Sequence, residues 1–116
     1  MSMAISLCVP PRQGELCLPV RFDLAAWHTV TELTSRHRVS RVEADETGKT
    51  AVVWVDITDP ATSRPVHIRF SVLPADADPV TVPEITVRSR ELGEVELGGE
   101  RFRVYGTYLG VVSDEN

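Results

Sequence analysis

Residues 23–38 read DLAAWHTVTELTSRHR, and the fold class depends on whether this stretch is helical. Asp23 suits an N-cap position, because its carboxylate can accept a hydrogen bond from a free backbone N–H of the first turn. Arg36 and Arg38 fall in the last turn, where cations interact favourably with the helix dipole. Three threonines lower the helix propensity, so packing would have to stabilise the helix. The stripe expected to face the core recurs at helical spacing and consists of Ala26, Trp27, Val30, Leu33 and His37.

Two alternating runs precede this predicted helix. Residues 3–9 and 15–20 place apolar side chains at every second position, which is typical of half-buried strands. The prolines and glycine between them indicate a turn. In the register that keeps one face apolar, Cys8 lies opposite Cys17, within disulfide reach. The two residues are either reduced thiols or a redox-sensitive disulfide, and the sequence leaves both alternatives open.

Further strands follow the predicted helix. Residues 39–45 and 50–57 form a hairpin in which Val42 faces Val53 and Arg41 faces Trp54. Residues 65–72 alternate most regularly, with Val66, Ile68, Phe70 and Val72 directed to the core. The proline-rich stretch 73–83 indicates a loop, and residues 84–90 a strand with Ile85 and Val87 inward.

The dipeptide Gly98-Gly99 predicts a last hairpin, because a two-residue turn of this kind favours glycine at both positions. In that register Val95 faces Phe102, and Glu94 faces Arg103 across the strands. Residues 113–116 are expected to fray into solvent. The order β-β-α-β-β-β-β-β, joined by short links, predicts one α+β domain over residues 1–116. Its mostly antiparallel, curved sheet of about six to seven strands would pack on the single helix.

Composition limits the possible partners. The 116 residues carry a net charge of −5, which argues against a general nucleic-acid binder because such proteins rely on many cationic contacts to phosphate. No apolar run approaches the roughly 20 residues that span a bilayer, and no basic leader precedes residues 3–9. We therefore expect a soluble, cytoplasmic protein, and the predominance of arginine over lysine is typical of a bacterial, GC-rich genome.

Motifs for catalysis or cofactors are not found. The sequence contains no GxSxG, GxGxxG or GxxxxGK[ST] motif, and the two cysteines lack the spacing of a metal site. We expect no cofactor, no metal and a non-enzyme rather than an enzyme, although a catalytic triad can assemble from residues far apart in sequence.

The outward face of the predicted sheet is the candidate binding surface. Arginine and tryptophan are favoured interface residues, and a cation–π contact between Arg41 and Trp54 is expected. Either this face is solvated, with its arginines paired to Glu43, Glu94 and Glu96, or it docks an acidic partner. The candidate docking residues are Arg41, Trp54, His67, Arg69, Arg88, Arg90, Arg101 and Arg103.

Three functions remain open from the sequence. The leading hypothesis is a small protein-binding module, such as an accessory subunit, inhibitor or immunity protein. It would use this face or an edge strand, and edge pairing could also form a homodimer. The alternative is a small-molecule or catalytic site between helix and sheet, lined by Trp27, His37, Tyr105 and Tyr108. The third is nucleic-acid binding through the arginines.

Overall fold

The computed structural model describes residues 17–58 and 64–112. Within these ranges the chain forms strands joined by turns and one short 3₁₀ turn. The elements are β1 (Cys17–Leu24), β2 (His28–Thr34), β3 (His37–Ala44), β4 (Ala51–Thr58), β5 (Pro65–Pro74), η2 (Pro79–Thr81), β6 (Ser89–Leu97) and β7 (Glu100–Val111).

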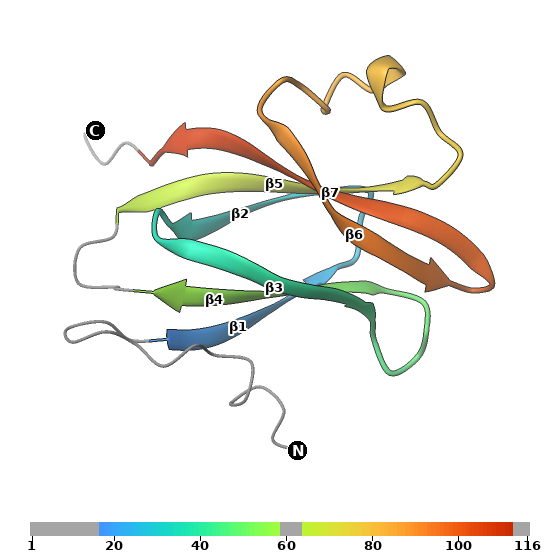
Figure 1. The fold of residues 1–116 in the computed structure, drawn as a ribbon, viewed down its shortest axis with the longest axis horizontal. Coiled ribbons are helices and arrows are strands. Elements are labelled where there is room, and N and C mark those ends of the chain that lie inside the picture. The colour runs from blue at the N-terminus through green and yellow to red at the C-terminus, as the bar shows by residue number, and fades with distance from the viewer. Residues whose placement is uncertain (1–16, 59–63, 113–116) are drawn as a thin grey trace.

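The strands form two antiparallel sheets that pack face to face as a sandwich (Figure 1). One sheet has the order β1-β4-β3, and the other has the order β2-β5-β7-β6. β4 is central in the first sheet, as its nearly continuous apolar sequence predicts. The chain crosses between the sheets at the β1–β2, β2–β3 and β4–β5 connections, so neighbouring strands in the sequence are often not neighbours in a sheet.

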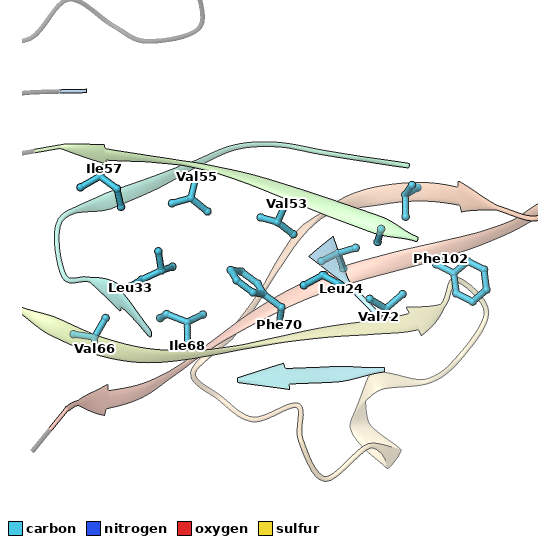
Figure 2. Close-up of a cluster of buried hydrophobic side chains, with 13 residues drawn as sticks. Leu24, Leu33, Val53, Val55, Ile57, Val66, Ile68, Phe70, Val72 and Phe102 are labelled. Carbon is cyan, nitrogen blue, oxygen red and sulfur yellow. The ribbon is translucent and has the colours of Figure 1, made fainter. Parts of the chain in front are cut away.

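The core lies between the two sheets, and Figure 2 shows its side chains directed toward one another. β4 contributes every second residue from Val53 to Ile57, and β5 contributes every second residue from Val66 to Val72. This period of two is the alternation expected when one face of each sheet is buried. The alternation predicted for residues 65–72 is confirmed.

The helix predicted over residues 23–38 is wrong. These residues form the end of β1, a bend at 25–27, all of β2, a second bend and the start of β3. Thr29, Val30 and Thr31 are β-branched and favour extended backbone, and pairing with β5 supplies the hydrogen bonds that a helix would have made internally. The α+β class is therefore also wrong, because the described residues offer no helix for a sheet to pack on, and their strands form two sheets rather than one curved sheet.

Both hairpins predicted from short turns are confirmed in register. Val42 pairs with Val53 and Arg41 with Trp54 in β3–β4. In β6–β7, Val95 pairs with Phe102, Glu96 with Arg101 and Glu94 with Arg103. Gly98 and Gly99 have φ angles of +59° and +87°, which only glycine adopts readily and which a two-residue hairpin turn of this type requires.

Two other strand predictions have different outcomes. The strand predicted at 84–90 is wrong, because β6 begins only at Ser89 and the segment 75–88 crosses the outer face of the four-stranded sheet. The hairpin of residues 3–9 lies outside the described residues, as does the tail at 113–116. Among the described residues, no helix is long and apolar enough to cross a membrane.

Candidate functional site: an apolar cavity at one end of the sandwich

Three connections meet at one end of the sandwich and enclose a cavity. They are the β1–β2 bend, the β3–β4 turn and the β6–β7 turn, of which the last two lie at the right in Figure 1. The Gly98 N–H donates a hydrogen bond of 3.0 Å to the Gly48 carbonyl, so the two turns are joined directly. The cavity has a volume of about 580 Å³ and is lined by Leu24, Ala25, Ala26, Trp27, Lys49, Val72, Leu97, Gly98 and Phe102.

Trp27 forms part of the cavity wall while remaining 57% exposed. Its ring packs against Phe102, with 5.9 Å between ring centroids and 40° between ring planes. The Val72 N–H donates to the Trp27 carbonyl at 2.8 Å, which fixes the backbone of the bend to β5. An aromatic ring held beside an apolar cavity and open to solvent is typical of a binding contact.

Lys49 is the one charged residue among the described residues that line the cavity. The turn that carries it is organised by Asp45, whose Oδ1 accepts hydrogen bonds from the Thr47 hydroxyl at 2.8 Å and from the Thr47, Lys49 and Thr50 N–H groups at 3.1–3.3 Å. The Thr47 hydroxyl bond is the largest cause of the lowered pKa of Asp45, and the backbone bonds add to it. Within the described part of the chain, the Lys49 ammonium makes no ion pair.

The cavity can bind but has few means to catalyse. Its volume falls in the range of about 300–1,000 Å³ that small-molecule sites occupy, and such sites combine apolar walls with a few polar groups. Among the described residues, the wall has no carboxylate, hydroxyl, thiol or imidazole side chain that could act as a nucleophile or general base.

Arg41 and Trp54 lie together on the outer face of the three-stranded sheet. The Arg41 guanidinium carbon lies 5.2 Å from the Trp54 ring centroid, so the predicted cation–π contact is confirmed. The Trp54 indole N–H donates to Glu43 at 2.7 Å, and Arg41 Nε lies 3.4 Å from the other oxygen of the same carboxylate. Glu43 is therefore the partner of both the Trp54 indole N–H and the Arg41 charge, while Arg41 Nε makes no hydrogen bond within the described part of the chain.

The other predicted docking residues belong to the opposite sheet. His67 and Arg69 lie on β5, Arg101 and Arg103 on β7, Arg90 on β6, and Arg88 just before β6, so the eight residues do not share one face. Arg101 and Arg103 lie 3.9 and 3.3 Å from Glu94, and the Arg88 guanidinium carbon lies 5.9 Å from the Tyr108 ring centroid. The structure thus divides the predicted surface between the two sheets of the sandwich.

A half-buried polar cluster holds segment 75–88 against the outer face of the four-stranded sheet. His28 Nδ1 lies 2.9 Å from the Ser71 hydroxyl, and His28 Nε2 lies 3.4 Å from Glu84. Arg69 donates to the Glu84 carbonyl at 3.4 Å. Although serine, histidine and carboxylate follow one another here, Ser71 is 0% exposed, so a substrate could not reach its hydroxyl in this conformation. These contacts fix segment 75–88 to the four-stranded sheet through Glu84.

Sequence reasoning missed this cluster and most of the cavity wall. His28 faces Ser71 because β2 pairs with β5, and residues 43 positions apart carry no local signal of that contact. Of the pocket residues proposed from sequence, only Trp27 lines the cavity. His37, Tyr105 and Tyr108 lie elsewhere. Cys8 is outside the described residues and Cys17 is in β1, so a bond between them stays a prediction.

Comparisons with known proteins give no relative for this chain. No family model, curated protein or solved structure matches it. Among the described residues, no three His, Cys, Asp or Glu side chains are grouped so that they could hold a metal ion. We therefore infer a function from the geometry of the end cavity beside Trp27, called the Trp27 cavity below.

Proposed function

We propose that this chain is a non-catalytic binding module that takes up a small apolar ligand in the Trp27 cavity. The observation that carries the proposal is an apolar volume of about 580 Å³ with an exposed tryptophan in its wall. Removing apolar surface from water stabilises a complex by about 25 cal/mol per Å². A ligand that fills the cavity would cover both its own apolar surface and part of the Trp27 ring.

The arginine and tryptophan surface supports binding less well than the cavity. Its tryptophan is bonded to Glu43, and three of its arginines lie near Glu43 or Glu94. Such exposed pairs contribute little stability, but they already give these arginines a charged partner within the chain. A nucleic-acid strand would also need cations along one continuous path, whereas these are divided between two sheets.

The test is calorimetric titration of the protein with decanol, an uncharged probe with a flexible apolar chain. We expect saturable binding with one site per chain, which Trp27→Ala weakens about five-fold, because losing about 40 Å² of apolar contact costs roughly 1 kcal/mol. Trp54→Phe is the matched control, since Trp54 lies on the outer face of the other sheet. Failure of decanol to bind the wild-type protein, or equal affinities in the two variants, would contradict the proposal.

A second candidate function is docking of a protein strand on β2, as the edge-strand hypothesis proposes. β2 is an edge of the four-stranded sheet, runs without a bulge and carries Glu32 as its one charged side chain besides histidine. The other edge, β6, is interrupted by a bulge between Glu91 and Gly93, and bulges and charges discourage strand addition. Beside β2, a groove of about 340 Å³ opens between Val20, Phe22, Leu33 and Ile57.

This second function predicts self-association. A second copy could pair its own β2 with this one and extend the sheet. We expect a dimer by light scattering, and Val30→Lys should convert it to a monomer because a charge on an exposed edge opposes pairing. A wild-type protein that stays monomeric at millimolar concentration would contradict the proposed homodimer.

A further inference from the structure

We infer that the Trp27 cavity selects an amphipathic carboxylate, whose apolar chain fills the cavity and whose charged end pairs with Lys49. This inference rests on the proposed function and specifies its ligand. It depends on the position of Lys49 in an otherwise uncharged wall, in a chain whose net charge is −5.

The acids nearest to Lys49 in sequence are engaged elsewhere. The Asp45 oxygen that organises the turn accepts its bonds from one hydroxyl and three backbone N–H groups. Glu46 lies 3.3 Å from Arg21, and the pKa of its carboxyl is lowered first by a hydrogen bond from its own backbone N–H and then by this contact. Neither carboxylate is paired with Lys49 in the structure. A cation at the mouth of an apolar cavity, left without an internal partner, is complementary to an anionic ligand end.

The surroundings favour a carboxylate over a phosphate. Phosphate sites usually combine arginine forks or several free backbone N–H groups with the lysine. Here the Lys49 N–H is bonded to Asp45 and Thr47, and the Gly98 N–H is bonded to Gly48, so those backbone donors are already used. A lone ammonium matches a single negative charge in number, because lysine is a compact point charge.

The size of the cavity agrees with a medium-length alkyl or aryl acid. Its volume is that of a site for one drug-sized molecule rather than for a lipid with two acyl chains. Leu24, Val72 and Phe102 lie at its floor and are buried, while Lys49 is exposed at the rim. This arrangement directs the apolar end of a ligand inward and leaves its charged end near water.

The experiment compares three ten-carbon probes at equal chain length: decanoate, decanol and decyltrimethylammonium, each below its aggregation concentration. We expect the wild-type protein to bind decanoate about five-fold more tightly than decanol, which is the upper range for an ion pair at an exposed rim, and the cation most weakly. Lys49→Met should give decanoate and decanol equal affinities, because the variant lacks the ammonium that favours the anionic probe. Lys49→Arg is the matched control and should keep the preference.

The outcomes separate this inference from the proposed function. Saturable decanol and decanoate binding with equal affinities in the wild-type protein overturns the carboxylate inference and leaves the cavity as a binding site. Retention of the preference in Lys49→Met also overturns it. Absence of saturable binding by all three probes overturns the proposed function itself.

Discussion

At the scale of single residues, Asp45 has the clearest structural role. One of its carboxylate oxygens accepts hydrogen bonds from a hydroxyl and three backbone N–H groups, and thereby orders the turn that presents Lys49 to the cavity. Gly48 completes this turn with φ +73°, a conformation that costs other residues about 1 kcal/mol or more. The charged rim of the cavity therefore depends on a side chain that does not line it.

Asp45→Ala should lower stability at neutral pH and flatten its dependence on acid. The folded pKa of Asp45 is depressed, chiefly by the Thr47 hydroxyl, so its contribution is present above the unfolded pKa of about 4 and is lost as pH falls through the folded pKa. Urea denaturation at neutral pH and at successively lower pH measures this. Asp45→Asn keeps an oxygen acceptor and should retain part of the stability but not the pH dependence. Identical acid profiles for Asp45→Ala and wild type would contradict the assignment.

At the scale of elements, β2 shows why the helix prediction failed. Its inward residues are Thr29, Thr31 and Leu33, so only one of the three is strongly apolar and the period of two is weak in the sequence. Trp27, Val30 and Leu33 meanwhile fit helical spacing by coincidence. Pairing with β5 overrides the local pattern, because the segment gains hydrogen bonds to β5 along one of its edges and buries Leu33.

Two alanine variants distinguish strand from helix at β2. Leu33 is 5% exposed and Val30 is 56% exposed, although helical spacing would place both on the core side. Leu33→Ala should therefore destabilise the protein by about 2–5 kcal/mol, and Val30→Ala by no more than about 0.5 kcal/mol. Chemical denaturation gives both values. Similar large losses in the two variants would restore the helical interpretation.

At the scale of the whole molecule, the two long sides of the sandwich differ. On one side β3 packs against β6, and a Cβ placed on Gly93 would lie 3.4 Å from Val42 Cβ. On the other side a groove separates Val20 and Phe22 from Leu33. The two sheets therefore approach each other closely at Gly93, which has no side chain to keep β6 away from β3. The end cavity and the side groove remain open where no such contact forms.

Gly93 should tolerate a methyl group but not a larger side chain. Gly93→Ala places its Cβ at an ordinary contact distance from Val42, so its stability should stay within about 0.5 kcal/mol of wild type. Gly93→Leu forces β3 and β6 apart and should cost about 1–3 kcal/mol, as overpacking does. Denaturation midpoints of the two variants measure the difference. A stable Gly93→Leu protein would show that the sheets do not approach as closely as this.

The candidate site divides in the same way between local and distant contacts. Lys49 and Gly98 lie in turns whose hairpins can be predicted from their glycines and flanking alternation. The sequence predicts Trp27 as a pocket residue on a helix, whereas in the structure it lies in the β1–β2 bend. Val72 and Phe102 come from β5 and β7 of the four-stranded sheet. Their place in the cavity follows only from the packing of the two sheets.

Local sequence patterns are enough to predict the hairpins β3–β4 and β6–β7, their registers and the inward residues of β5. In each case the information is local: a glycine turn, a period of two, or opposite charges across a short loop. The sequence does not predict the pairing of β1 with β4 or of β2 with β5. It also does not predict that three connections border a cavity at one end of the sandwich. Those contacts join residues far apart in the chain, and the free energy that selects them comes from burying two whole sheet faces together.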